Sequence, residues 1–438
     1  MRHRQLRVVA IGSLVVLAAV TGCSSSAKSG SGGTKGDSTG VTATTITIGS
    51  TQPLTGVAAP GYSEIAPAAK AYFDYLNSQG GINGRTIIYK YLDDAYNPTQ
   101  TLAKTQELIL QDKVFAIFNA LGTPTHQKVV DLLNQSKVPD MFVASGCLCW
   151  DNVSQHPETF GWQTDYVVEG KILGNYLKAK FPGKKIAYFY QADDFGQGGV
   201  QGLDMELPKS QVVSRQSYQP TNINILSQVT ALKASHADIV VSFSVPAFTA
   251  LLRLNMLRVG YNAQLAVSNV GSDPLTLSGL LETFAKTGGA TVKGSALIQG
   301  IITDGYIASP ADASNSWIQL FKKVHDQYDA SAPFDGNVLY GMAVAYTFAE
   351  AIAKAGKNLT RESLVSAVEG GLDPGPGLVP FRFSSSSHAG YTGAQIGVIS
   401  GTTIGLIGQP QTTDDSSGPV VASTTPLSTA PSNGVPTG

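Results

Sequence analysis

The chain has 438 residues, of which 42% are hydrophobic and 14% charged, and its 30 basic and 31 acidic residues give a formal net charge of −1. This balance provides no broadly basic surface, which excludes a protein that binds nucleic acid through the phosphate backbone. The length is sufficient for two globular lobes of ordinary size.

The N-terminus has the three-part layout of a secretory signal. Arginines precede a short apolar run from Val8 to Val20, and small residues then lead into Cys23. The run is shorter than the roughly 20 apolar residues that a helix needs to span a bilayer. The order Val-Thr-Gly-Cys, followed by serines, resembles the lipobox of bacterial lipoproteins. It predicts a signal peptide over 1–22, a lipid on the Cys23 thiol and an exported protein with a membrane anchor; an ordinary signal peptide is the alternative.

Two further segments have compositions that are unsuited to a packed core. Residues 24–40 consist almost entirely of Ser, Gly, Thr and Lys, which predicts a flexible tether over 23–43. Residues 409–438 are rich in Pro, Ser and Thr and have few large apolar side chains, which predicts a disordered tail.

Between these segments, apolar strands and amphipathic helices alternate in two blocks. Strands are expected over 45–49, 86–92, 114–118, 138–143, 185–190 and 239–243, and helices over 66–76, 99–110, 124–134, 223–232 and 246–257. This alternation predicts an α/β fold with parallel sheets covered by helices. Ligands of such sheets bind beyond the carboxyl ends of the strands. Two blocks in one chain favour two lobes with a cleft between them.

Specific motifs resemble the branched-chain amino acid (Leu/Ile/Val) binding proteins of ABC importers. The most specific are Asn-Ser-Gln-Gly-Gly-Ile-Asn-Gly-Arg at 77–85 and Leu-Asp-Asp-Ala-Tyr-Asn-Pro at 92–98, supported by the segments 49–56 and 194–198. The resemblance implies a type I periplasmic-binding-protein fold of two lobes, each a parallel sheet flanked by helices, with three hinge crossings. It places the first lobe at 44–163 and 297–375, and the second at 164–296 and 376–408.

The same resemblance implies a function. It indicates a monomeric, lipid-anchored substrate-binding protein that captures a small polar solute, such as an amino acid, and delivers it to the membrane subunits of an ABC transporter, without a cofactor. Motifs of hydrolases, zinc proteases and P-loop enzymes are absent from the sequence, which favours a protein that is not an enzyme. A ligand-sensing lipoprotein and an extracytoplasmic enzyme on the same fold are the alternatives.

The best candidate for a ligand contact in the sequence is Gly122-Thr123-Pro124-Thr125, which follows a strand and opens a helix. Thr123 is predicted to be the N-cap, with Pro124 at the first helical position. The start of a helix offers unpaired N–H groups to an anion. In the resembled family the matching hydroxyl holds the α-carboxylate of an amino acid; the alternative is that Thr123 only caps its own helix.

The resemblance implies further ligand contacts from both lobes. Ala144 matches a residue whose carbonyl accepts from the ligand's amine, and Ser145 and Gly146 complete that loop. From the other lobe, Phe195 matches an aromatic residue that covers the ligand, and Ser244 matches a position that often holds Tyr.

Asn269 departs from the pattern of the resembled family, in which the approximate match is a glutamate that pairs with the ligand's ammonium. An amide does not neutralise that charge, and an unpaired buried charge is costly. Either Asp273 or another acid compensates, or the ligand carries no ammonium. The second alternative is favoured, which predicts a carboxylate, an amide or another small polar solute.

Cysteine usage is sparse. With Cys23 lipidated, Cys147 and Cys149 form the one remaining pair in an oxidising compartment. A disulfide between them is predicted, with free thiols as the second alternative. A metal site ranks third, because His126 and His156 match no zinc spacing.

Overall fold

The computed structural model describes residues 36–437. The predicted signal peptide, Cys23 and most of the predicted tether lie outside that range. Among the helices of the described residues, none is long and apolar enough to cross a membrane.

The first sheet has five strands in the order β2-β1-β3-β4-β5, and all of its pairings are parallel. Its strands are β1 (Thr45–Gln52), β2 (Thr86–Asp93), β3 (Ile117–Phe118), β4 (Asp140–Val143) and β5 (Thr159–Gly161). Ile46 and Ile48, which alternate with polar residues at the start of β1, are fully buried. Their burial follows from the two-residue period of a strand, which directs them to the same face.

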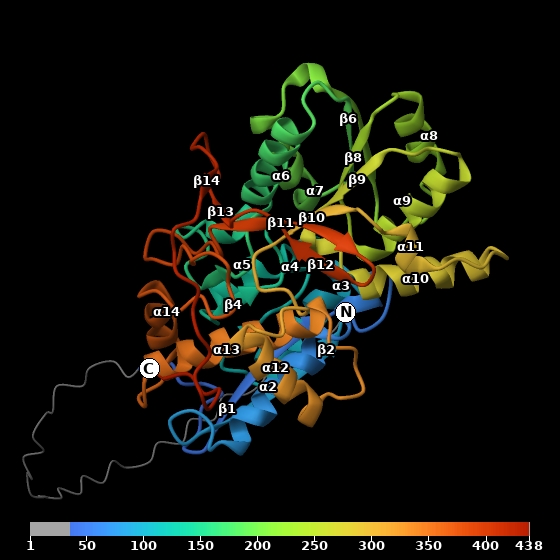
Figure 1. The fold of residues 1–438 in the computed structure, drawn as a ribbon. Helices are drawn as coiled ribbons and strands as arrows, with labels where there is room; N and C mark the ends of the chain where they lie inside the picture. The colour runs from blue at the N-terminus through green and yellow to red at the C-terminus, as the bar shows by residue number, and fades with distance from the viewer. Residues whose placement is uncertain (1–35, 438) are drawn as a thin grey trace, which may run out of the picture. The chain divides into compact units, whose positions relative to one another are not determined.

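Helices from distant parts of the chain surround this sheet or pack on the helices that cover it. They are α1 (Ala59–Tyr62), α2 (Ile65–Ser78), α3 (Pro98–Gln106), α4 (Thr123–His126), α5 (Val130–Gln135), α12 (Ser316–Tyr328), α13 (Gly336–Ala355) and α14 (Arg361–Glu369), with short turns of helix η1 (Glu107–Gln111) and η2 (Leu148–Asp151). The blue α2 and the orange α13 lie side by side although they are far apart in the sequence (Figure 1). The helix predicted over 124–134 is two short helices, α4 and α5, because residues 127–129 form a turn.

The second sheet has nine strands in the order β14-β13-β11-β10-β9-β8-β6-β7, with β12 paired to β11. They are β6 (Ile186–Gln191), β7 (Val212–Tyr218), β8 (Ile239–Phe243), β9 (Gln264–Val267), β10 (Ile302–Gly305), β11 (Gly393–Ser400), β12 (Thr403–Leu406), β13 (Gln411–Thr412) and β14 (Val421–Ala422). The strands β6 to β10 pair in parallel, whereas β11 to β14 pair antiparallel. This sheet is therefore mixed, where a parallel sheet was predicted.

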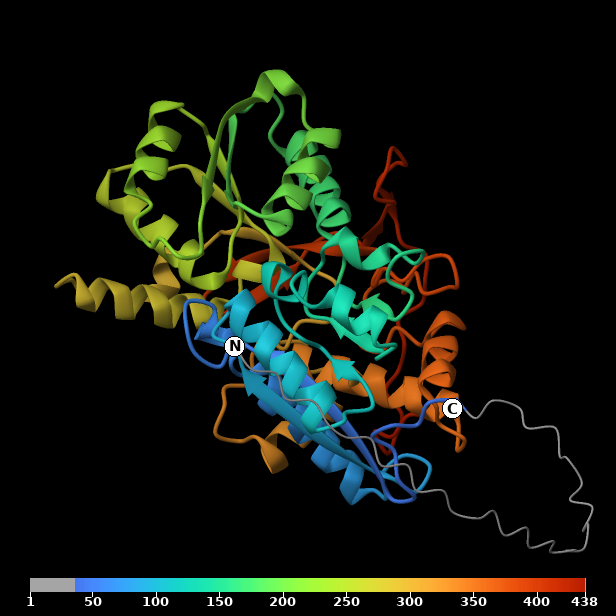
Figure 2. The same cartoon turned by 180° about the vertical axis from the view of Figure 1, so that it is seen from behind.

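Helices lie on both faces of the second sheet, green on one side and yellow-green on the other (Figure 2). They are α6 (Tyr166–Lys180), α7 (Asp194–Glu206), α8 (Leu226–Ala234), α9 (Pro246–Arg258), α10 (Pro274–Thr287) and α11 (Gly294–Leu297), with short helices η3 (Lys209–Gln211) and η4 (Asn269–Gly271). The glycines of α7 allow it to pack closely against α6. A Cβ atom at Gly202 would lie 2.1 Å from the carbonyl oxygen of Val167. Such a clash excludes every residue except glycine at this position.

The lobe boundaries differ from the predicted ones. Strand β10 pairs with β9 of the second sheet, so residues 302–305 belong to the second lobe. Phe383 lies beyond the predicted crossing at 376, yet its ring packs against Phe142 and Phe160 of the first lobe. This aromatic packing holds the chain on the first lobe until β11 begins at Gly393.

The C-terminal segment differs from the predicted disordered tail. Strands β13 and β14 extend the second sheet. The chain then reaches the first lobe, where the hydroxyls of Tyr72 and Tyr75 donate hydrogen bonds of 2.9 and 2.7 Å to the carbonyls of Gly434 and Asn433. Its few large side chains led to the prediction of disorder, but its backbone carbonyls pair with side chains of both lobes.

The end of the predicted tether is also packed against the first lobe. A carboxylate oxygen of Asp37 lies 2.8 Å from the guanidinium of Arg361, and Val41 forms a β-bridge with Ile46. Because Arg361 is only 7% exposed, its charge requires an anionic partner nearby. The flexible segment predicted over 23–43 is thus packed from Asp37 onwards.

Candidate ligand-binding site

A cavity of about 360 Å³ lies between residues of the two lobes. Many of its lining residues lie in the loops after strands: Gly122 comes after β3, Ala144 after β4, Val245 after β8, Asn269 after β9 and Tyr306 after β10. The cavity thus lies at the carboxyl ends of both sheets, where α/β proteins bind ligands. Its volume is in the range of sites for small molecules.

The walls of the cavity are rich in aromatic rings. They come from both lobes: Tyr62, Tyr96, Tyr166, Phe195, Tyr306, Phe334 and Tyr340. The rings of Tyr166 and Phe195 are in contact, with 4.7 Å between their centroids. Burial raises the pKa of Tyr166 to about 12, so its phenol is neutral and its O–H group is a hydrogen-bond donor.

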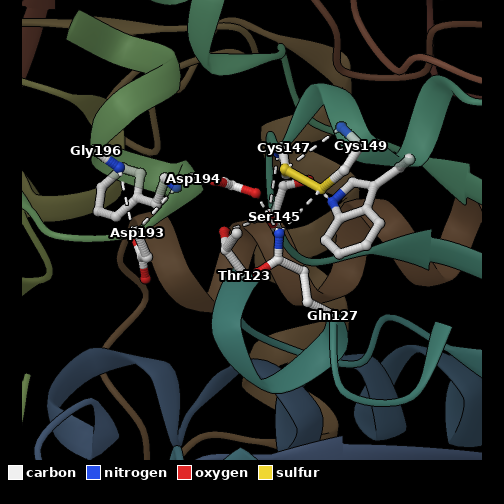
Figure 3. Close-up of a disulfide and its surroundings, with 10 residues drawn as sticks. Thr123, Gln127, Ser145, Cys147, Cys149, Asp193, Asp194 and Gly196 are labelled. Atoms are coloured by element: carbon white, nitrogen blue, oxygen red, sulfur yellow. Dashed lines mark hydrogen bonds between the residues drawn. A yellow bond between two sulfur atoms is a disulfide. The ribbon is translucent and has the colours of Figure 1, made fainter.

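The structure places Thr123 differently from its predicted role as a helix cap. Gly122 is the N-cap of α4, with a φ angle of 107°. A Cβ atom at Gly122 would lie 2.5 Å from the ring of Tyr96, so the position requires glycine both for its backbone angle and for space. The hydroxyl of Thr123 lies 2.7 Å from that of Ser145 and caps no helix (Figure 3).

Three of the predicted contact residues do not line this cavity. Ser145 stands behind Thr123 and, with Gly146, borders a separate small hollow beside Trp150. Ser244 is fully buried, and its hydroxyl lies 2.8 Å from that of Thr249. The hydroxyls of both serines lie beside other buried hydroxyls of their own lobes, which a position in the sequence does not reveal.

A disulfide bond joins Cys147 to Cys149 next to the cavity loops (Figure 3). The indole N–H of Trp150 donates a hydrogen bond of 3.0 Å to the carbonyl of Ser145. Asp194 brings a carboxylate near the two sulfur atoms, but these sulfurs are bonded to each other and are therefore not free thiolate ligands for a metal.

Among the lining residues within 36–437, the ionisable groups other than tyrosines are three carboxyls, those of Asp273, Asp304 and Asp335. Burial, together with the carboxylates of Asp273 and Glu64, raises the pKa of Asp335 to about 8. Burial also raises the pKa of Asp304, to about 6. No lysine, arginine or histidine lines the cavity among the described residues.

Hydrogen bonds connect the two lobes beside the cavity. The N–H of Gly336 donates to the carboxylate of Asp273 over 3.1 Å, and the amide of Asn337 donates to the hydroxyl of Thr276 over 3.2 Å. Such contacts between lobes describe a closed cleft.

Comparison with known proteins agrees with this arrangement. A family model described as periplasmic binding protein matches residues 45–402, most of the chain. The chain belongs to the periplasmic binding protein family. This periplasmic binding protein is 25% identical over 206 residues to the Leu/Ile/Val-binding protein homolog 3 of Brucella melitensis, over 44% of this chain and 53% of that relative. The chain thus spans about half the length of the curated relatives that it matches.

Solved structures show the same fold. A branched-chain amino acid ABC transporter structure from Thermus thermophilus with bound valine has a TM-score of 0.73 and 18% identity, over 85% of this chain and 97% of the other. A fatty acid ABC transporter substrate-binding protein from Thermomonospora curvata has a TM-score of 0.72 and 23% identity, over 86% and 95% of the two chains. The type I fold predicted for this periplasmic binding protein is confirmed.

Sequence reasoning located part of the cavity of this periplasmic binding protein. Of the predicted contacts, five line it: Gly122, Thr123, Ala144, Phe195 and Asn269. The sequence analysis missed the tyrosines that line the cavity and the carboxyls of Asp304 and Asp335, because these residues belong to no motif. Asp335 shares one sequence signal with Asp273, since both precede a helix as its N-cap.

Proposed function

We propose that this periplasmic binding protein captures a small polar solute, an amino acid or a related compound, between its lobes and delivers it to an ABC importer. The observation that carries the proposal is the cavity at the carboxyl ends of both sheets, beside hydrogen bonds between the lobes. The relatives named above are binding proteins, which supports binding over catalysis.

The mechanism is hinge closure. A ligand that contacts both lobes binds the closed form better than the open form, so its binding energy shifts the equilibrium toward closure. The permease then recognises the closed form. The predicted lipid on Cys23 holds the monomer at the outer side of the membrane, where it exchanges ligand with the permease.

Roles for the lining residues follow from their chemistry. Thr123 donates its hydroxyl to a polar oxygen of the ligand, such as a carboxylate, and Ser145 orients that hydroxyl from behind. The Ala144 carbonyl at the same wall accepts from the N–H of Gly122 and has a second lone pair for the ligand. Phe195 covers the apolar part of the ligand from the second lobe. Ser244 and Gly146 shape the loops and do not contact the ligand.

A thermal-shift screen of the purified protein tests this function. The panel contains amino acids, aliphatic and aromatic carboxylates, amides, polyols and urea. A ligand present well above its dissociation constant raises the melting temperature because it binds only the folded state. We expect a concentration-dependent rise with at least one compound; no rise with any of them would contradict the proposed capture of a small polar solute. Release of an unaltered compound after denaturation distinguishes binding from turnover.

A further inference from the structure

We propose that residues 423–428 form a strap, a fourth connection between the two lobes that limits their movement relative to each other. Within 36–437 the chain also passes between the lobes at three crossings: from β5 to α6, from β10 to α12, and from Phe383 to β11. The family match ends at residue 402, so the strap lies beyond the part of the chain that matches the family. The inference concerns lobe movement and goes beyond the proposed capture of a solute.

The three crossings pack together into one hinge. Trp162 follows β5, Tyr306 follows β10 and Tyr391 precedes β11. The centroid of the Trp162 ring lies 5.9 Å from that of Tyr306 and 5.1 Å from that of Tyr391, and the two tyrosine centroids are 5.4 Å apart. Because contacts between these rings hold the three segments together, the lobes can rotate about this cluster while its contacts persist.

The strap is attached to the first lobe away from this hinge. The indole N–H of Trp317 donates a hydrogen bond of 3.0 Å to the carbonyl of Ser428, and the Trp317 ring packs on Tyr346 of α13, with 4.6 Å between centroids. On the same helix, Tyr340 contacts Trp162 of the hinge at 5.0 Å. The six residues from Tyr340 to Tyr346 span about 9 Å of an α-helix. A connection that is offset in this way changes its length when the lobes rotate.

Further contacts hold the first-lobe end of the strap in place. The N–H of Ala430 donates a hydrogen bond of 3.0 Å to the hydroxyl of Ser316, and the α2 tyrosines described above donate to the carbonyls of residues 433 and 434. Gly434 is buried, and Trp317 is only 1% exposed. Releasing this end would leave buried donors without acceptors, which is costly.

The second-lobe end is held by a buried charge. The ammonium of Lys171 on α6 lies 2.7 to 2.8 Å from three carbonyl oxygens of the loop 414–418 and 3.1 Å from the carboxylate of Asp414. Because Lys171 is 1% exposed, loss of the loop would leave this charge without its partners. The N–H of Ser423 then donates a hydrogen bond of 2.8 Å to the carbonyl of Pro410, next to β13. The strap therefore starts from a fixed point on the second lobe.

The strap between these two ends is short. Ser428 follows Ser423 by five residues, and residues 424–427 are exposed. A fully extended chain covers about 3.3–3.6 Å per residue, so the strap reaches at most about 17–18 Å. Pro426 fixes one φ angle and makes the strap stiffer. A rotation of the lobes that needs a greater length must detach one of the two ends.

Lengthening the strap tests the inference. A Gly-Ser linker of about 12 residues, with a root-mean-square length of about 17–21 Å, is inserted between Pro426 and Leu427, which keeps both ends attached. A second variant carries the same linker between Thr424 and Thr425, so that the result does not depend on one insertion site. The matched control has the linker between Gly288 and Gly289, in an exposed turn after α10.

Pulsed electron–electron double resonance on the purified protein without ligand measures the distance between the lobes. Spin labels are attached to Gln100→Cys on α3 and Gln201→Cys on α7, which are exposed positions of the two lobes. The remaining cysteines do not react, because Cys147 and Cys149 are bonded to each other and the predicted lipid occupies Cys23.

We expect both strap insertions to broaden the distribution of label-to-label distances and to shift its mean, whereas the control insertion leaves the wild-type distribution unchanged. The wild-type distribution in both strap variants would overturn the strap as a limit on lobe movement. This outcome would leave the proposed capture of a solute standing, since the thermal-shift screen tests that function separately.

Discussion

The hydroxyl of Tyr62 donates a hydrogen bond to the backbone carbonyl of Val270, with 2.6 Å between the two oxygens. Tyr62 belongs to the first lobe, and Val270 lies in the second lobe next to Asn269. Both residues line the cavity. The bond therefore connects closure of the cleft to the loop after β9, whose residues Asn269 and Val270 line the cavity.

Changing Tyr62 to Phe removes this bond and keeps the ring. Because the bond exists only when the lobes are together, the variant is expected to weaken the closed form by about 0.5–1.5 kcal/mol and ligand affinity by the corresponding factor of about 2–10. Titration calorimetry measures the change. Tyr176→Phe on α6, where the structure shows no hydrogen bond to the hydroxyl, is the control; an equal loss in both variants would contradict the role of Tyr62 in closure.

The Thr123 hydroxyl is expected to bind a ligand oxygen directly. Thr123→Val keeps the shape of the side chain and should weaken binding by about 1–3 kcal/mol. Ser145→Ala removes the group behind Thr123 and should cost less, because it affects only the orientation of the hydroxyl. Affinities of the two variants are compared with that of Thr283→Val, an exposed change on α10. Unchanged binding in a folded Thr123→Val variant would reject the contact.

The disulfide between Cys147 and Cys149 is expected in the exported protein, because the compartment is oxidising and the two sulfurs are bonded in the structure. The intact mass of the purified protein should rise by two hydrogens after reduction. Cys147→Ser serves as the control, since it removes the difference. An equal mass with and without reductant would show that the thiols are free in solution.

Lys171 is expected to hold the C-terminal segment in place. The side chain is 1% exposed, and its ammonium lies 2.7 to 2.8 Å from the carbonyl oxygens of Asp414, Ser416 and Gly418. Lys171→Met removes the donor to all three carbonyls, of which only that of Gly418 keeps another donor, the Thr413 hydroxyl. The change should lower the free energy of unfolding by about 1.5–3 kcal/mol.

Limited proteolysis measures this effect at the C-terminus. Cleavage within 409–437 should be faster in Lys171→Met than in Lys178→Met, where the altered side chain is exposed on the same helix. Identical cleavage rates in the two variants would indicate that Lys171 does not hold the segment.

Stability is expected to fall as the pH rises from about 5 to about 8. The folded state raises the pKa of Asp335 to about 8, whereas an aspartate in the unfolded chain titrates near 4. Between these values the folded state binds the proton more tightly, so the free energy of unfolding decreases with rising pH.

Asp335→Asn should flatten this dependence. The amide oxygen can still cap α13, where Asp335 Oδ1 accepts from the N–H groups of Asn337 and Val338. The loss in the free energy of unfolding between pH 5 and pH 8 should be smaller in the variant than in wild type, by on the order of 1–3 kcal/mol. Chemical denaturation at the two pH values measures it. The same slope in Asp335→Asn and wild type would assign the pH dependence to other groups.

Local signals in the sequence were enough for the fold class and for part of the site. Alternation of apolar strands with helices predicted parallel α/β sheets, and the strand 239–243 has the predicted bounds. The glycine before Thr123 lies in the loop after buried strand β3, and Ala144 directly follows β4. Their place at the carboxyl edge could therefore be predicted from order along the chain.

Tertiary structure decided the chemistry of the cavity and the course of the C-terminus. Asn269 lies 100 residues after Glu169 and 35 residues before Asp304 in the sequence. Only the pairing of β9 with β10 and the packing of α6 bring their polar groups together. The C-terminal segment forms hydrogen bonds with Lys171 and with tyrosines of α2, none of which its own composition reveals. The physical reason is the same in both cases: strand and helix patterns depend on neighbours in sequence, whereas buried charge and backbone carbonyls are satisfied by whichever distant side chains the fold places beside them.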